Sequence, residues 1–124
     1  MILHIDFETR STLELPEVGV HKYATHPSTD VWCMGWAIDD REPELWTPSD
    51  GTPKLIAACL RDGALVTAHN AAFELQIWNN ILVPRYGWPV LKPRQVRCTM
   101  AQAYAMSLPG SLEKAAAAVG ITQQ

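Results

Sequence analysis

The chain has 124 residues, of which 48% are hydrophobic and 19% charged, and its formal net charge is −3 at pH 7. This length suits one domain with a single core, and the high apolar content with a small net charge excludes intrinsic disorder. No stretch approaches the ~18 consecutive apolar residues of a membrane-spanning helix, so we expect no membrane partner. The slight acidity excludes attachment to nucleic acid by bulk positive charge, but it allows contact through metal ions bound to carboxylates.

The cysteines and the first residues bear on the cellular compartment. Cys33, Cys59 and Cys98 are odd in number, far apart and never paired as CxxC, so we expect reduced, buried thiols and neither disulfides nor a zinc site. The sequence begins Met1-Ile2-Leu3-His4, without the basic region, apolar run and small-residue cleavage site of a secretory signal. Both features are typical of a cytoplasmic protein.

Two apolar runs with β-branched or aromatic residues, 2–8 and 31–38, predict strands. Between them a polar stretch is followed by Pro16 and Gly19, which break regular structure. Residues 44–47 predict a short third strand after a turn-like segment.

The next part of the sequence predicts a helix and a buried strand. Thr52 has the character of an N-cap, and Pro53 suits the first helical position. Asp62-Gly63 ends this helix, and the short apolar run 64–68 then predicts a strand.

The rest of the chain predicts three helices. We expect Asn70 to cap a helix that runs to about Leu82, and the proline-rich segment 85–97 to form a loop or an edge connection. Thr99-x-x-Gln102 matches a capping box and predicts a second helix. Ser111 caps the third, whose apolar side carries Leu112, Ala115, Ala116 and Val119 and which stops at Gly120.

In chain order, therefore, the predicted elements are β-β-(β)-α-β-α-(β)-α-α. This order is typical of a mixed α/β domain with an early antiparallel meander and flanking helices. The sequence contains no internal repeat, low-complexity tract or linker, so we expect residues 1–124 to form one domain.

Two carboxylates stand near the end of the first predicted strand. Asp6 and Glu8 share one face, roughly 6.5–7 Å apart along the strand, while Leu3, Ile5 and Phe7 share the opposite, core-facing side. Like charges that point the same way repel each other unless a cation lies between them, and oxygen ligands suit Mg²⁺ or Mn²⁺. An acidic strand end exposed to solvent is an equally good interpretation of this spacing alone.

A third carboxylate makes the metal interpretation stronger. At about 100° per residue, Glu74 falls on the apolar arc of its predicted helix, with Phe73 and Ile77 on one side of it and Trp78 on the other. A charge there is costly unless it is paired or binds a metal, although the first helical turn does favour an anion. The alternative is that Glu74 reaches solvent because the helix begins there.

Together, Asp6-Phe7-Glu8-Thr9 and His69-Asn70-Ala71-Ala72-Phe73-Glu74 resemble the first two motifs of the DEDD 3′–5′ exonucleases. In that family a D-x-E motif stands on the first strand, and N-x-x-(F/Y)-D/E begins a helix after a strand. The resemblance implies a ribonuclease-H-like (DnaQ-like) fold.

The chain is most similar to the N-terminal proofreading domain of phage-type family A DNA polymerases. There a D-F-E-T-R-S opening is followed by G-V-x-x-Y, H-N-A-x-F-E, C-T-M and L-P-x-S-L-E. Each block has a counterpart here in the same order, and they extend over nearly the whole chain.

The chain departs from the family pattern in two places. The second motif commonly has Asp where this chain has Glu74. The family's third motif, a Tyr or His four residues before a fourth carboxylate, follows the last helix, and no such pair follows Gly120 before the chain ends at Gln124. We therefore expect a C-terminally truncated form of the fold that lacks the general base and fourth carboxylate.

The resemblance implies phosphodiester hydrolysis with two divalent cations, Mg²⁺ or Mn²⁺, about 4 Å apart. By position in the motifs, Asp6 would bridge both ions, Glu8 would hold the ion on the side of the attacking water, and Glu74 would serve the second ion. Because only two carboxylates remain for the first of these ions, we expect weak metal binding and poor nuclease activity from this chain alone. A polymerase domain, in cis or in trans, is the expected partner.

The resemblance also implies contacts to the 3′ end of single-stranded DNA. Thr9 would offer its backbone N–H, and Asn70 would bond the substrate or cap its helix. Phe73 would stack near a terminal base or join the core, and Arg10 would contact phosphate or remain a solvated charge, as would Lys22. The five tryptophans are scattered, which favours positions in and around the core over a stacking platform.

Two other functions remain open on the sequence. The first two motifs are shared with DnaQ-like exoribonucleases, so RNA is an alternative substrate. A degenerate domain that binds nucleic acid or a polymerase without catalysis is the non-enzymatic alternative.

Overall fold

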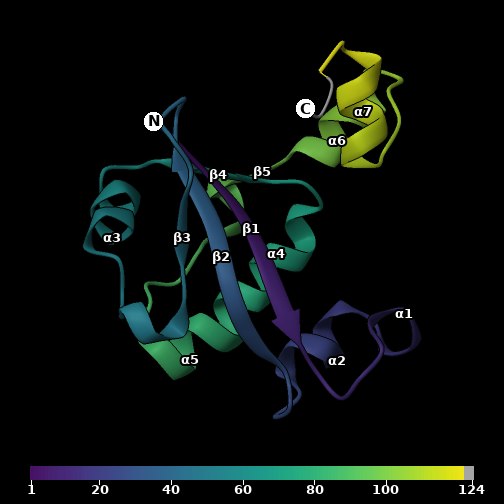
Figure 1. Cartoon of the computed structure of the whole chain (residues 1–124). Helices are drawn as coiled ribbons and strands as arrows, with labels where there is room; N and C mark the ends of the chain where they lie inside the picture. Colours follow the sequence, from purple (N-terminus) through teal and green to yellow (C-terminus); the bar gives the residue numbers. More distant parts are fainter. Residues whose placement is uncertain (122–124) are drawn as a thin grey trace.

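The computed structural model describes residues 1–121, which form a five-stranded mixed sheet flanked by helices (Figure 1). The strand order is β3-β2-β1-β4-β5. β2 is antiparallel to β1 and to β3, whereas β4 is parallel to β1 and to β5. The strands are β1 (Ile2–Arg10), β2 (Asp30–Ile38), β3 (Glu44–Trp46), β4 (Leu65–Ala68) and β5 (Val96–Cys98).

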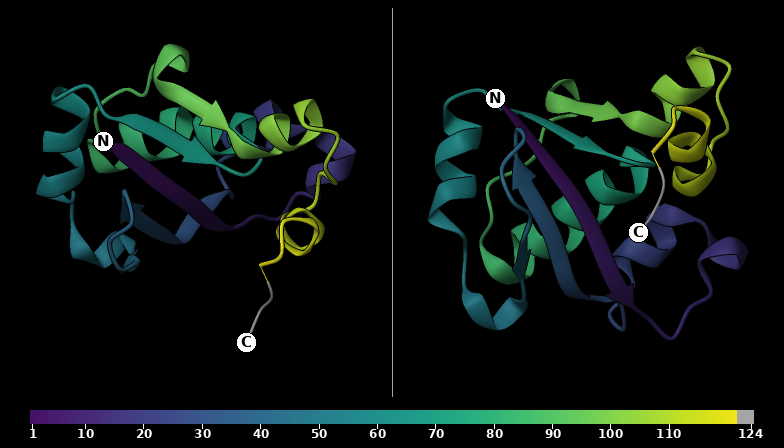
Figure 2. Two further views of the ribbon diagram at one scale, coloured as in Figure 1. Left: turned by 90° about the horizontal axis from the view of Figure 1, so that it is seen from above. Right: turned by 45° about the horizontal axis from the view of Figure 1, so that its top comes forward.

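The helices lie between and after these strands. In chain order they are α1 (Leu15–Val18), α2 (Val20–Thr25), α3 (Lys54–Arg61), α4 (Ala71–Ile77), a π-helical turn (Trp78–Leu82), α5 (Val83–Tyr86), α6 (Thr99–Ala105) and α7 (Leu112–Ala118). Two short 3₁₀ turns, Pro48–Asp50 and Pro93–Gln95, complete the list. Figure 2 shows α6 and α7 beyond the end of β5, on the opposite side of the molecule from α3.

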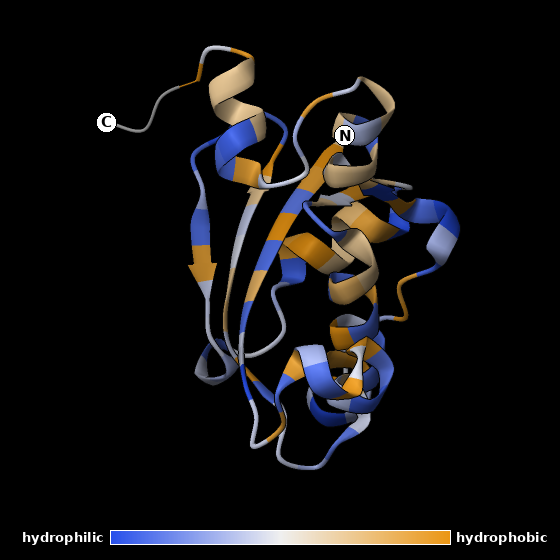
Figure 3. Cartoon of the chain, turned by 90° about the vertical axis from the view of Figure 1, so that its right-hand side faces the viewer, coloured by the Kyte–Doolittle hydropathy of each residue, from blue (hydrophilic) through white to orange (hydrophobic). Residues whose placement is uncertain are grey.

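The alternation predicted for the first strand is confirmed. Leu3, Ile5 and Phe7 are buried, and the residues between them are exposed. Hydrophobic and hydrophilic residues accordingly alternate along the long strands in Figure 3. The core face packs against α4 and the π-helical turn, where Trp78 is fully buried with its ring edge-on to Phe7 at 6.5 Å. Asp6 and Glu8 therefore lie on the face of β1 opposite the core.

The predicted mixed α/β organisation is confirmed, but two helices were missed between the first two strands. The sequence around Pro16 and Gly19 predicts broken structure, whereas the chain forms α1 and α2 there. Pro16 stands in the first turn of α1, where the missing N–H costs nothing. Gly19 adopts φ 81° between the two helices, a backbone conformation that glycine reaches without strain.

The helix predicted for residues 70–82 starts as expected but ends later. Its α-helical part passes into the π-helical turn and then into α5, so the helical path continues to Tyr86. Pro84 does not stop it because this proline lies in the first turn of α5. Gly87, at φ 71°, ends the path. The segment 85–97, expected as a loop or an edge connection, leads through the 3₁₀ turn Pro93–Gln95 into the edge strand β5 (Val96–Cys98).

Of the predicted helix caps, Ser111 is confirmed: its hydroxyl accepts a hydrogen bond from the Lys114 N–H at 3.2 Å. Asn70 stands at the predicted N-cap position of α4, but it has φ 77° and its side chain makes no capping bond. The prediction for Thr52 is wrong, since its hydroxyl donates instead to the Tyr86 carbonyl at 3.2 Å.

The capping box predicted at Thr99 is not formed either. The N-cap of α6 is Cys98, whose sulfur accepts a hydrogen bond from the Ala101 N–H at 3.5 Å. Tertiary hydrogen bonds to Ala68 and His69 occupy the Thr99 hydroxyl instead.

The cysteines and tryptophans differ in burial. All three cysteines are free, as predicted, but only Cys59 is buried, and Cys33 and Cys98 are partly exposed. Four tryptophans are buried (Trp36, Trp46, Trp78 and Trp88), and the last three form edge-on ring pairs. Trp32 is 64% exposed. No helix within residues 1–121 is both long enough and apolar enough to span a bilayer.

Candidate functional site

Among residues 1–121, β4 covers only the first part of one edge of the central strand β1. β4 pairs with β1 only at Ile2, His4 and the residue between them, although β1 continues to Arg10. Because the parallel strand ends early, the helix that follows it, α4, lies against β1 and brings Glu74 to this edge. The site therefore lies where β1 continues beyond the end of its parallel neighbour β4.

Glu74 is a buried carboxylate without sufficient partners. Its side chain is 4% exposed, and Oε2 has no hydrogen-bond partner among the described residues. Burial, with a further contribution from the charge of Asp6, raises the pKa of Glu74 from 4.5 to about 7, while its own N–H and that of Phe7 act in the opposite direction. The prediction that Glu74 faces the apolar side of its helix is confirmed, and the alternative that it escapes to solvent is wrong.

Asp6 and Glu8 stand on the exposed face of β1. Asp6 lies opposite Gly35 of β2, and Glu8 lies opposite Cys33. Within residues 1–121, no three His, Cys, Asp or Glu side chains come close enough together to hold a metal ion. The structure thus brings Asp6 near Glu74 as a pair, and Glu8 does not complete a three-carboxylate cluster with them.

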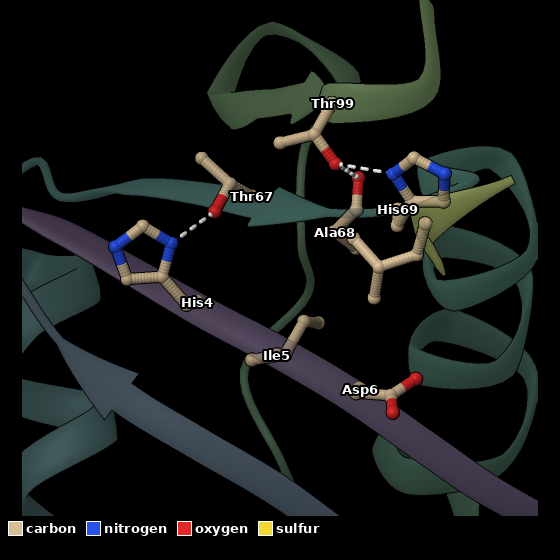
Figure 4. A pocket seen from close by; sticks show the side chains of 8 residues that line it. His4, Ile5, Asp6, Thr67, Ala68, His69 and Thr99 are labelled. Atoms are coloured by element: carbon tan, nitrogen blue, oxygen red, sulfur yellow. Dashed lines mark hydrogen bonds between the residues drawn. The ribbon is translucent and has the colours of Figure 1, made fainter. Parts of the chain in front are cut away.

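A pocket opens beside Asp6 (Figure 4). Its walls come from β1, from the end of β4, from Thr99 at the start of α6 and from Leu112 at the start of α7. On one side the His4 ring is bonded to the Thr67 hydroxyl, with 2.6 Å between Nδ1 and Oγ1. The pocket is lined by His4, Ile5, Asp6, Thr67, Ala68, His69, Thr99 and Leu112.

His69 joins the site to the C-terminal helices, and the sequence did not point to it. Its Nδ1 lies 2.9 Å from Thr99 Oγ1, and its Nε2–H donates to the Gly110 carbonyl at 2.5 Å. One side chain at the end of β4 thereby holds both the start of α6 and the loop before α7. The available signal was its place directly before Asn70 in the second motif.

Thr9 and Phe73, both predicted near a substrate terminus, meet at Tyr23 of α2. The Thr9 hydroxyl lies 2.8 Å from the Tyr23 hydroxyl. The half-buried Phe73 ring packs against the Tyr23 ring at 6.1 Å and 44°. Both residues therefore help to join β1, α2 and α4, which agrees with the expected core role of Phe73.

The two remaining predicted contact residues lie on the surface. Arg10 is exposed, and its guanidinium lies 3.6 Å from the Asp30 carboxylate. Asp30 is also contacted by the Arg85 guanidinium at 3.8 Å and by the Tyr86 hydroxyl at 2.9 Å. Asn70 is exposed at the start of α4. Arg10 is thus only partly neutralised, because its partner is shared.

Comparison with known proteins gives one significant similarity. No family model matches the chain. The chain is 29% identical, over 125 aligned positions, to a protein named DNA polymerase from Bacillus phage SP02. The aligned part covers 98% of this chain and 18% of the phage protein, so the chain spans less than a fifth of that relative's length. Nearly all of this chain is therefore similar to one segment of a phage DNA polymerase.

Proposed function

We propose that the chain is a ribonuclease-H-like (DnaQ-like) 3′–5′ exonuclease domain that works with a phage-type DNA polymerase. Its substrate is the 3′ end of single-stranded DNA, which it shortens by metal-dependent hydrolysis of the terminal phosphodiester. The observation that carries the proposal is the buried carboxylate of Glu74, which interacts with the charge of Asp6 and whose Oε2 has no hydrogen-bond partner among residues 1–121.

The arrangement of the two motifs supports this assignment. The resemblance requires D-x-E on the first strand and Glu74 in a helix that directly follows another strand. In the structure Asp6 and Glu8 lie on β1, and Glu74 lies on α4, directly after the parallel strand β4. The similarity to a phage DNA polymerase supports a polymerase-related role by an independent route.

The donor atoms fit a hard divalent cation. A buried carboxylate whose pKa is raised to about 7 and whose oxygen lacks a partner gains most from a cation, because the cation stabilises the ionised form. Asp6 and Glu74 would hold one Mg²⁺ or Mn²⁺ ion between them, and Glu8, at the next outward-facing position of β1, would contact the other ion. Two such ions, when bound, supply an activated water and charge stabilisation at the scissile phosphate.

The residues around the carboxylates would position the DNA. The backbone N–H of Thr9 and the exposed side chain of Asn70 would contact the terminal nucleotide. Phe73, half-buried against Tyr23, would present its free edge to the terminal base. Arg10 would contact a phosphate, since Asp30 offers it only a long ion pair.

The carboxylate pair alone makes a weak site. Because no three metal-binding side chains converge among residues 1–121, the chain's affinity for Mg²⁺ or Mn²⁺ should be low. A further ligand and a general base would come from polymerase-associated sequence in cis or in trans. We therefore infer that the isolated chain is a slow nuclease.

The test begins with metal binding. Calorimetric titration of Mn²⁺ at pH 8 should give weak binding to the unmodified chain and none to Asp6→Asn or Glu74→Gln. Glu113→Gln, an exposed change on α7, is the matched control and should bind like the parent. Binding that survives in both site variants would refute the proposed metal site.

Activity is measured on 5′-labelled single strands of DNA and of RNA. We expect slow, Mn²⁺-dependent shortening of the DNA from its 3′ end, one nucleotide at a time, and its loss in Asp6→Asn. Faster digestion of the RNA would indicate an exoribonuclease. Oligonucleotide binding without any cleavage or metal binding would indicate a non-catalytic domain.

A further inference from the structure

One of the five tryptophans differs from the other four in its exposure. Trp36, Trp46, Trp78 and Trp88 are each at most 9% exposed, whereas Trp32 is 64% exposed. A tryptophan left in water does not gain the free energy that its burial would provide, and the strand pairing shows why Trp32 is left exposed.

The cause is an irregularity in the pairing of β1 with β2. Glu8 pairs with Cys33 and Thr9 pairs with Val31, so Trp32 is an extra residue that faces no partner on β1. Val31 and Met34 are both buried, and the two residues between them both point away from the core, as at a β-bulge. The bulge therefore places Trp32 on the same face of the sheet as Glu8.

The neighbours of Trp32 on this face carry the chemistry of the proposed site. Asp6, Glu8 and Arg10 alternate along β1 on the side opposite the core. Across from Asp6 stands Gly35, which has no side chain to fill the space above the strand. Trp32 lies on β2, beside the part of β1 between Glu8 and Arg10. An aromatic surface and a cation therefore lie next to the carboxylates on the same face of the sheet.

We propose that Trp32 stacks on a nucleobase of the single strand whose 3′ end lies at Asp6 and Glu74. The inference rests on the proposed function and adds to it a binding residue outside both motifs. Stacking on an exposed indole accepts every base, which suits an enzyme that removes whichever nucleotide is at the end. Arg10, on the same face of β1, would contact a phosphate of the same strand.

The first experiment measures binding separately from cleavage. Fluorescein-labelled dT₁₂ is titrated with the 124-residue chain in EDTA, and anisotropy is followed. Trp32→Ala should weaken binding about tenfold, which corresponds to about 1.4 kcal/mol, whereas Trp32→Phe should stay within about threefold. Val90→Ala, which changes an apolar residue that is 61% exposed in the segment after α5, is the control and should have no effect.

The second experiment locates the contact. 5-Bromodeoxyuridine is placed in turn at the last four positions of the oligonucleotide, irradiated with the chain and mapped by mass spectrometry. We expect a cross-link to Trp32 from one or two of these positions.

The outcomes separate this inference from the proposed function. Equal affinity of Trp32→Ala and the parent, with no cross-link at Trp32, overturns the stacking role and leaves the exonuclease proposal intact. Failure of the parent chain to bind any single strand overturns both. A circular dichroism spectrum of Trp32→Ala that matches the parent spectrum shows that the variant is folded, so that weaker binding is not caused by unfolding.

Discussion

The sheet region, residues 1–98, and the two C-terminal helices, residues 99–121, are held together in different ways. Every member of the buried core cluster comes from the sheet region, between Leu3 and Leu91. In contrast, α6 buries only Ala103 and α7 buries nothing, and Leu112 and Val119 remain 64% and 57% exposed. The proposed ligands lie on the densely packed part, while one wall of the pocket beside Asp6 lies on the loosely packed part.

At the junction between the sheet region and the two C-terminal helices, polar contacts replace hydrophobic burial. The hydrogen bonds of His69 to Thr99 and Gly110, and of Thr99 to Ala68, connect α6 and the loop before α7 to the end of β4. Each such bond contributes only about 1 kcal/mol, much less than the burial of several apolar side chains. The core therefore fixes the positions of the proposed metal ligands, whereas the pocket wall depends on a few hydrogen bonds.

The largest expected effect is on the free energy of unfolding, when a leucine is replaced by alanine once in each region. Leu3→Ala removes a fully buried side chain from the central strand and should lower the free energy of unfolding by about 2–5 kcal/mol. Leu112→Ala removes an exposed side chain from α7 and should change it by less than about 0.5 kcal/mol. Urea denaturation followed by circular dichroism measures both. Similar losses would show that α7 is packed as firmly as the sheet.

The second effect concerns pH. Because the pKa of Glu74 is raised from 4.5 to about 7, the unfolded chain releases this proton at a lower pH than the folded chain does. Between these two values the free energy of unfolding therefore falls as pH rises, by about 3 kcal/mol in total. Glu74→Gln should remove this contribution to the fall in the free energy of unfolding.

Urea titrations at intervals from pH 4 to pH 8 test that prediction, with Glu113→Gln as the exposed control. Saturating Mn²⁺ at pH 8 should raise the stability of the parent chain but not that of Glu74→Gln. If the free energy of unfolding changed with pH in the same way for the parent and for Glu74→Gln, the raised pKa of a buried Glu74 would be contradicted.

The smallest effect is local. His69→Ala removes two hydrogen bonds of the junction and should raise amide exchange in residues 99–121 by about tenfold, equivalent to 1–2 kcal/mol, without changing exchange in β1 or β2. Hydrogen exchange read by mass spectrometry gives both values in one experiment. His21→Ala, which removes a longer 3.3 Å contact to Gln76, is the control. Uniformly faster exchange would mean that His69 supports the whole fold.

Periodicity was a good guide wherever one face of an element is buried. The alternation in β1 predicted which of its residues enter the core, and the helical arc around Phe73 predicted the burial of Glu74. Residue type was a poorer guide to the caps: Asn70, Thr52 and Thr99 are all typical cap residues, and none of their side chains makes the expected capping bond. Local patterns do not show that a cap residue has been drawn into a tertiary hydrogen bond or into a left-handed conformation.

The strands, most of the helices and the sides of β1 and α4 that carry the carboxylates could be predicted from the sequence, because they follow from the short-range spacing of apolar and charged residues. Three features could not: β4 ends before β1 does, Glu74 thereby reaches Asp6 with no partner for Oε2 among residues 1–121, and a bulge turns Trp32 outward. These features depend on pairing between segments far apart in the chain. No local pattern records where a neighbouring strand stops.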